Sequence, residues 1–267
     1  MRPVAGHVAR KRFGQHFLVD ASVIAAIVAA IDPREGQVIV EIGPGLAALT
    51  VALLERVSRL HAVEIDRDLA ARLRRRWAPG RLELHEADAL RFDFASIAAD
   101  GAAAAPLRLV GNLPYNISSP LLVHLLAFRE RVVDQHFMLQ KEVVDRIVAT
   151  PGGSGFGRLS VLLQACYEVE ALFVVPPQAF DPPPAVDSAV LRMTVRREVA
   201  GEDTASLQRL LAAGFAQRRK MIRKTLLPWL AGQGVRADDL DPVLRPEDLD
   251  IATWIDLARR LREAEGG

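Results

Sequence analysis

The chain has 267 residues, a formal net charge of +1, 50% hydrophobic residues and 25% charged residues, as is typical of a soluble globular protein. This length is sufficient for one large domain, or for a large domain and a small one. No hydrophobic run reaches the length of a membrane span, and the basic N-terminus lacks the hydrophobic segment of a signal peptide. We therefore expect a cytoplasmic protein that binds no membrane.

Cysteine and histidine usage argues against a metal or disulfide protein. The single cysteine, Cys166, excludes a disulfide within the chain and a cysteine metal site. Its hydrophobic surroundings in the sequence indicate a buried structural thiol. The six histidines lack the spacing of metal ligands, so we predict that no metal is bound.

Hydrophobic patterns predict strands that alternate with helices over the first 150 residues. Asp20 is the expected N-cap of the first helix, which ends at Ile31. Further helices are expected at residues 47–56, 68–77, 121–126 and 141–149. Strands are expected at residues 38–42, 60–65, 82–85, 107–110 and 132–139. This alternation implies right-handed crossovers and a largely parallel sheet.

The remainder of the chain has a different pattern. After a helix at residues 159–167, two strands at 169–175 and 186–195 predict an antiparallel hairpin at the edge of the sheet. Residues 197–206 are polar and are interpreted as a linker, and only helical patterns follow from Leu207. We predict two domains, an α/β domain at residues 1–198 and a small helical domain at 199–267.

Four residues with ligand-binding potential recur just past predicted strands. Gly43, Glu64, Asp88 and Asn112 follow one another at intervals of 21, 24 and 24 residues, about the length of one β-α unit. They should therefore lie along one carboxyl edge of the sheet, which is where open α/β sheets bind ligands.

The segment Glu41-Ile-Gly-Pro-Gly45 is predicted to form a strand-to-helix turn. Its glycines allow backbone amides to approach a ligand, and Glu64 can accept hydrogen bonds from ribose hydroxyls. Residues 43–48 also match the dinucleotide pattern G-x-G-x-x-A, so an NAD-binding domain or a purely structural turn remains an alternative. Three features favour S-adenosylmethionine over a dinucleotide. Glu41 could meet an ammonium group, Asp88 suits an adenine amino group, and the sequence shows no set of residues for hydride transfer.

The segment Asn112-Leu-Pro-Tyr115 suits recognition of a base. Pro114 stiffens the backbone. The Asn112 amide and a backbone carbonyl can accept hydrogen bonds from an exocyclic amino group, while the Tyr115 ring stacks on the base. The structural alternative is a loop in which Tyr115 packs and Asn112 caps. Phe180, in a proline-dense loop, is either a second stacking ring or a core residue.

Together, the motifs resemble the bacterial rRNA adenine N6-dimethyltransferase family of the KsgA (RsmA) type, in order and spacing, over about residues 10–225. They are KRFGQHFL at 11–18, EIGPG at 41–45, NLPY at 112–115, LQKEVVDR at 139–146, FDPPP at 180–184 with VDS at 186–188, and QRRK at 217–220. The chain departs from the family pattern at Ala47, where a third glycine is usual, and at His16, where asparagine is often found.

The resemblance implies a Rossmann-like class I methyltransferase domain with a helical C-terminal domain. It implies that two adjacent adenines, in a hairpin loop near the 3′ end of 16S rRNA, are dimethylated during ribosome biogenesis. Asn112 and the Pro114 carbonyl would hold the target amino group between the rings of Tyr115 and Phe180. The expected S-adenosylmethionine site comprises Gln15, His16, Leu18, Glu41, Gly43, Gly45, Glu64, Ile65, Asp88, Ala89 and Asn112.

Basic residues cluster in the predicted helical domain and in the N-terminal arm. The expected RNA-binding residues are Arg10, Lys11, Arg12, Arg218, Arg219, Lys220, Arg223 and Lys224. On a helix, the last five would contact phosphates, although a solvated helical face is the alternative.

Several functional alternatives remain open from the sequence. They are an N6-adenine methyltransferase for large-subunit rRNA or DNA, a non-catalytic assembly factor that binds pre-ribosomes, and an NAD-dependent enzyme. The expected partner is 16S rRNA in the small subunit or its precursor, and the chain is expected to be a monomer.

Overall fold

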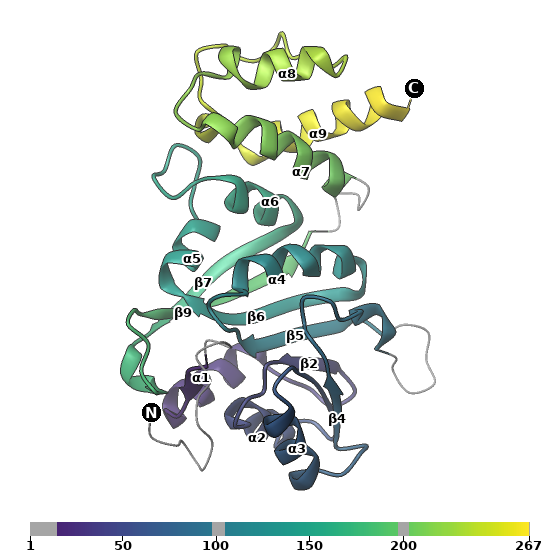
Figure 1. The fold of residues 1–267 in the computed structure, drawn as a ribbon, viewed down its shortest axis with the longest axis vertical. Coiled ribbons are helices and arrows are strands. Elements are labelled where there is room, and N and C mark those ends of the chain that lie inside the picture. The colour runs from purple at the N-terminus through teal and green to yellow at the C-terminus, as the bar shows by residue number, and fades with distance from the viewer. Residues whose placement is uncertain (1–14, 98–104, 197–202, 267) are drawn as a thin grey trace. The chain divides into compact units, whose positions relative to one another are not determined.

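The computed structural model describes residues 15–97, 105–196 and 203–266, and Figure 1 shows its ribbon. The chain groups into two compact units. The sheet unit contains residues up to 144 and residues 170–193, and the helical unit contains residues 145–169 and 194–267. The predicted domain division between residues 198 and 199 stays a prediction. The observed grouping differs from it because residues 145–169 pack with the C-terminal helices.

A seven-stranded sheet with the strand order β4-β3-β2-β5-β6-β9-β7 forms the centre of the fold. Strands β4, β3, β2, β5 and β6 pair in parallel, and β9 and β7 occupy the edge where the hairpin was predicted. The strands are β2 (Val38–Ile42), β3 (Leu60–Glu64), β4 (Leu82–Glu86), β5 (Leu107–Asn112), β6 (Val132–Gln140), β7 (Tyr167–Val175) and β9 (Ser188–Val195). A separate antiparallel pair joins β1 (Phe17–Leu18) to β8 (Phe180–Asp181). The predicted α/β class is confirmed.

The helices that connect the strands agree with the predicted alternation. They are α1 (Ala21–Ile31), α2 (Ala48–Leu54), α3 (Arg67–Arg76), α4 (Ser118–Leu125), α5 (Lys141–Ile147) and α6 (Arg158–Cys166). The Asp20 carboxylate caps α1 as predicted, accepting hydrogen bonds from the backbone N–H groups of Ser22 at 2.8 Å and Val23 at 3.1 Å. Cys166 is buried and forms no disulfide, as its interpretation as a structural thiol predicts.

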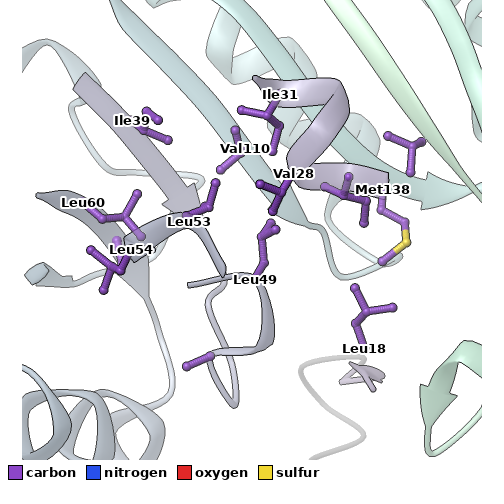
Figure 2. Packing of buried hydrophobic residues seen from close by; sticks show 14 of the residues in the cluster. Leu18, Val28, Ile31, Ile39, Leu49, Leu53, Leu54, Leu60, Val110 and Met138 are labelled. Carbon is purple, nitrogen blue, oxygen red and sulfur yellow. The ribbon is translucent and has the colours of Figure 1, made fainter. Parts of the chain in front are cut away.

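One hydrophobic cluster joins the first two helices to the sheet. Figure 2 shows Val28 and Ile31 of α1 near Val110 of β5, with Leu49 and Leu53 of α2 beside them. Hydrophobic side chains repeat at helical spacing on α1 and α2, so each helix turns one hydrophobic stripe to the strands. Packing of this kind holds the first strand-to-helix turn, between β2 and α2, against the rest of the sheet.

The helical unit contains α6, α7 (Asp203–Gly214), α8 (Leu226–Gly232) and α9 (Ile251–Gly266). The predicted linker is wrong at its end, because residues 203–206 belong to α7. Ser206 is buried together with Leu207 and Leu210, so the inward face of α7 begins before the first hydrophobic residue of the pattern. Among the described residues, no helix has the length and hydrophobicity to cross a bilayer.

The predicted helix that carries residues 218–224 is also wrong. The chain instead forms two short 3-10 segments, η5 (Phe215–Gln217) and η6 (Ile222–Lys224), with a turn between them. Met221 is extended, and the backbone N–H of buried Ile222 donates to the Leu244 carbonyl at 2.7 Å. This long-range contact replaces the hydrogen bonds that a continuous helix would form.

Candidate cofactor and base site

A cavity of about 320 Å³ lies at the carboxyl ends of the parallel strands in the sheet unit. Its size falls in the range of small-molecule sites. Glu41, Glu64 and Asn112 lie at the carboxyl ends of β2, β3 and β5, and Asp88 follows β4. The structure places thirteen of the predicted site residues in its lining: Gln15, His16, Leu18, Glu41, Gly43, Gly45, Glu64, Ile65, Asp88, Ala89, Asn112, Pro114 and Tyr115.

The turn from β2 to α2 uses backbone angles that favour glycine. Gly43 and Gly45 have φ values of +71° and +58°, and the Gly43 N–H donates to the Val63 carbonyl at 2.9 Å. Ala47, at the departure from the family pattern, is also left-handed, with a φ of +72°. A Cβ atom in this conformation costs about 1 kcal/mol, so packing of the buried Ala47 must offset a local strain.

The Glu64 carboxylate is held in place by two backbone amides. One of its oxygens accepts from the Gly45 N–H at 3.1 Å and the other accepts from the Asp66 N–H at 2.9 Å. Burial raises the pKa of Glu64, while these hydrogen bonds oppose that rise. Because the carboxylate lines the cavity in a fixed orientation, it can accept hydrogen bonds from the hydroxyls of a bound nucleoside.

Glu41 is a buried carboxyl group without a cationic partner among the described residues. The Thr50 hydroxyl donates to it at 2.6 Å. Burial, with a smaller contribution from the charge of Glu64, raises the pKa of Glu41 to about 7. A carboxyl group kept in this state favours a ligand that brings its own positive charge.

The hydrogen bonds of Asn112 determine which of its amide atoms is available. Its NH₂ group donates to the His16 carbonyl at 2.9 Å, so the amide oxygen remains to accept a hydrogen bond from a ligand. The backbone N–H of Leu113 donates to the Met138 carbonyl at 3.1 Å. These contacts hold the turn that contains Pro114, whose carbonyl accepts a hydrogen bond from the Ile117 N–H at 3.2 Å and retains a second lone pair.

Tyr115 contacts side chains from two distant segments. Its ring stacks on the His16 ring, with centroids 5.6 Å apart and planes inclined by 26°. Its hydroxyl is 2.6 Å from the Ser188 hydroxyl. The His16 Nδ1 atom is 2.8 Å from the Pro182 carbonyl oxygen, so Nδ1 carries the proton and donates. These contacts agree in part with the structural alternative, in which Tyr115 packs within the loop, although the ring also lines the cavity.

Phe180 does not join the cavity lining. It pairs with Leu18 across β1 and β8, is buried, and belongs to the hydrophobic cluster of the sheet unit. This position agrees with the alternative that Phe180 is a core residue, and its role as a stacking ring stays a prediction.

The sequence reasoning assigned no role to two residues near the site. His136 of β6 lines the cavity and is buried, and burial lowers its pKa to about 4, so it is neutral near pH 7. It stood inside a predicted strand, where no local signal marks the side that faces a ligand. Ser188 stood in a quoted motif, but its partner Tyr115 is 73 residues away.

The predicted RNA-binding residues divide into three groups. Arg10, Lys11 and Arg12 lie outside the described residues. Arg218 pairs with Glu247 and donates to the Ser154 carbonyl at 2.7 Å, so its charge is partly neutralised. Arg219, Lys220, Arg223 and Lys224 have exposed side chains.

Across the described segments, no group of three or more histidine, cysteine or acidic residues could hold a metal ion.

The family model described as "Ribosomal RNA adenine dimethylase" matches residues 6–263. The chain belongs to this family. It is 56% identical to "Ribosomal RNA small subunit methyltransferase A" of Bordetella petrii, over 97% of each chain. It is 55% identical to the protein of the same name from Thiobacillus denitrificans, over 93% of this chain and 96% of the relative.

Two solved structures of methyltransferases resemble the chain. A dimethyladenosine transferase from Plasmodium falciparum matches with a TM-score of 0.77 at 22% identity, over 94% of this chain and 98% of the other. The 23S rRNA methyltransferase ErmE matches with a TM-score of 0.65 at 25% identity, over 92% and 99%. These likenesses confirm the Rossmann-like methyltransferase fold with a helical C-terminal region.

Proposed function

We propose that this chain transfers methyl groups from S-adenosylmethionine to N6 of two adjacent adenines in a hairpin loop near the 3′ end of 16S rRNA, during ribosome biogenesis. Family membership supports an RNA adenine dimethyltransferase, and relatives that are 51% to 56% identical carry a small-subunit name. The observation that carries the proposal is the orientation of Asn112, whose amide oxygen is available beside Tyr115 in the cavity.

The charges and acceptors of the cavity fit S-adenosylmethionine. Glu64 suits the ribose hydroxyls, Asp88 suits the adenine amino group, and the buried carboxyl group of Glu41 suits the ammonium group. When bound, this cofactor supplies an electrophilic methyl group on a sulfonium. Glu41 would be ionised by that ammonium group, because a nearby positive charge lowers the pKa of a carboxyl group.

The chain's own contribution to the chemistry would be positioning. The lone pair of adenine N6 is delocalised into the ring, which makes the amino group a poor nucleophile. The Asn112 amide oxygen and the Pro114 carbonyl, as two acceptors, favour a pyramidal nitrogen whose lone pair points at the methyl group. Orientation and fixed dipoles account for large rate effects, and the proton lost from N6 can pass to water without a strong general base.

The base would stack on the face of Tyr115 that His16 does not cover. Adenines in a loop are readily splayed out and stacked on aromatic side chains. The exposed cations at residues 219–224 would contact RNA phosphates, and the helical C-terminal domain from residue 199 would bind the rRNA. The protein would act as a monomer. A ribosomal substrate implies that the enzyme works in the cytoplasm.

The first experiment measures tritiated methyl transfer from S-adenosylmethionine to small ribosomal subunits that lack the loop methylation. We expect incorporation to approach two methyl groups on each of two adenines, recovered as N6,N6-dimethyladenine. Asn112→Ala should slow the transfer by about a hundredfold to a thousandfold, as the loss of a positioned polar group in an active site does.

Large-subunit RNA and DNA serve as the competing substrates, because the chain also resembles a 23S rRNA methyltransferase. Transfer to either of these, with none to small subunits, would replace the proposed substrate. Intact cofactor binding without transfer to any nucleic acid would favour a non-catalytic assembly factor.

A further inference from the structure

The Tyr115 ring is held at two points by residues from distant parts of the sheet unit. Its hydroxyl meets the hydroxyl of Ser188, the first residue of β9, at 2.6 Å. Its ring stacks on His16, whose own Nδ1 is anchored to the Pro182 carbonyl. Both contacts converge on the ring that the proposed function assigns to the target base.

The two contacts restrain different motions of the ring. The tyrosine hydroxyl lies on the axis of χ2 rotation, so a hydrogen bond there resists a swing about χ1 and leaves χ2 free. Stacking on a neighbouring ring resists rotation about χ2, which for aromatic residues is otherwise broad. Ser188 and His16 together therefore define both the direction and the tilt of the Tyr115 ring.

Ser188 is well placed to act only through Tyr115. Its side chain is fully buried and is absent from the cavity lining. The backbone just before it is anchored as well, because the Lys141 N–H donates to the Asp187 carbonyl at 2.9 Å. A rigid, buried hydroxyl is a strong positional restraint on a side chain that is itself half-exposed to a ligand site.

We propose that Ser188 is a positioning residue of the methyl transfer, which holds Tyr115 at the angle needed to stack on the target adenine, with His16 as the second restraint. This inference rests on the proposed function. It predicts an effect on the RNA substrate and none on the cofactor.

The kinetic test is a double-mutant cycle on small subunits. Ser188→Ala should lower kcat/KM for the RNA by about tenfold, the effect of one lost hydrogen bond, and leave the dissociation constant of S-adenosylmethionine unchanged. In a Tyr115→Phe background, Ser188→Ala should cause no further loss, because the contact is already absent. Ser160→Ala removes another buried hydroxyl, hydrogen-bonded to the Arg146 carbonyl, and should leave kcat/KM unchanged.

A second measurement reports on the contact without any activity. The chain has two tyrosines, Tyr115 and Tyr167, so ¹³Cζ labelling gives two NMR signals, and Tyr115→Phe identifies one of them. Ser188→Ala should move the Tyr115 signal and leave that of Tyr167 in place. If the wild type is inactive on small subunits and Ser188→Ala still moves the Tyr115 signal, only the proposed substrate is refuted. An unmoved signal, an unchanged kcat/KM, or an equal loss in the Tyr115→Phe background would overturn the role of Ser188.

Discussion

The two compact units place charge in opposite ways. The sheet unit buries Glu41, Glu64 and Arg108, each with defined partners. In the described side chains of the helical unit, no charged group is buried, and its ion pairs, such as that of Arg260 with Asp239, lie at the surface. Buried charges are strongly oriented and suit a site for one small ligand, whereas exposed charges suit a long, flexible polyanion.

The two units should differ most in how much unfolding free energy is lost when an arginine is replaced by alanine. Arg108 bonds to Asp134 at 2.7 Å and to the Ile31 carbonyl at 2.6 Å, so Arg108→Ala leaves a largely buried carboxylate unpaired. We expect the free energy of unfolding to fall by about 3–5 kcal/mol, measured by chemical denaturation. Arg260→Ala, at an exposed pair, should change it little. Similar losses for both variants would contradict the contrast between the units.

The next effect concerns the pH dependence of stability. Burial raises the pKa of Glu41 from 4.5 to about 7, so the folded protein binds this proton more tightly than the unfolded chain. The stabilising contribution is complete below pH 4.5 and is lost as the pH rises through about 7, a fall of about 3 kcal/mol. The pH dependence contributed by Glu64 and by His136, whose pKa shift acts in the opposite direction, is common to both proteins, so the unfolding free energy of the ligand-free wild type should fall by this amount relative to that of Glu41→Gln across this range.

The same group should couple cofactor binding to proton release. If the cofactor's ammonium group ionises Glu41, binding at pH 7 releases part of a proton, and calorimetry in buffers of different ionisation enthalpy detects it. Equal binding enthalpies in all buffers would exclude Glu41 as the partner of that ammonium group.

Two glycines, one in each unit, should differ because one is tightly packed and the other is open. A Cβ atom at Gly111 of β5 would lie 2.4 Å from the Ile42 carbonyl oxygen of β2, so Gly111→Ala must push two adjacent strands apart. We expect a loss of about 1–3 kcal/mol of unfolding free energy. Gly232→Ala, at the end of α8 with no atom within 4 Å of the new Cβ, should stabilise the chain by up to about 1 kcal/mol. An unchanged unfolding free energy for Gly111→Ala would mean that β2 and β5 can move apart without loss of stability.

The smallest effect is expected for the exposed cations. Replacing Arg219 and Lys220 with glutamine should weaken RNA binding and lower the slope of log affinity against log salt by about one for each lost phosphate contact. Cofactor affinity should not change. Arg209→Gln, whose arginine pairs with Glu265, is the matched control, and an equal change in its salt slope would remove the special role of residues 219 and 220.

The order of elements and the ligand edge could be predicted because both depend on local patterns. Hydrophobic runs identified β2, β3 and β5 to within two residues. Polar residues spaced by one β-α unit identified Glu64, Asp88 and Asn112 as neighbours, and all line one cavity. Parallel topology brings strand ends together regardless of the details of packing.

Features that depend on contacts between distant residues were decided by the tertiary structure. Phe180 packs in the core, the charge of Arg218 is partly neutralised by Glu247, and residues 218–224 form no continuous helix. Each outcome depends on a partner far away in the chain, for which a local pattern carries no signal. The sequence by itself determined which chemical groups reach the cavity. Only the tertiary structure decided how they are oriented, because Asn112 and Tyr115 are held by His16 and Ser188 through contacts that span 96 and 73 residues.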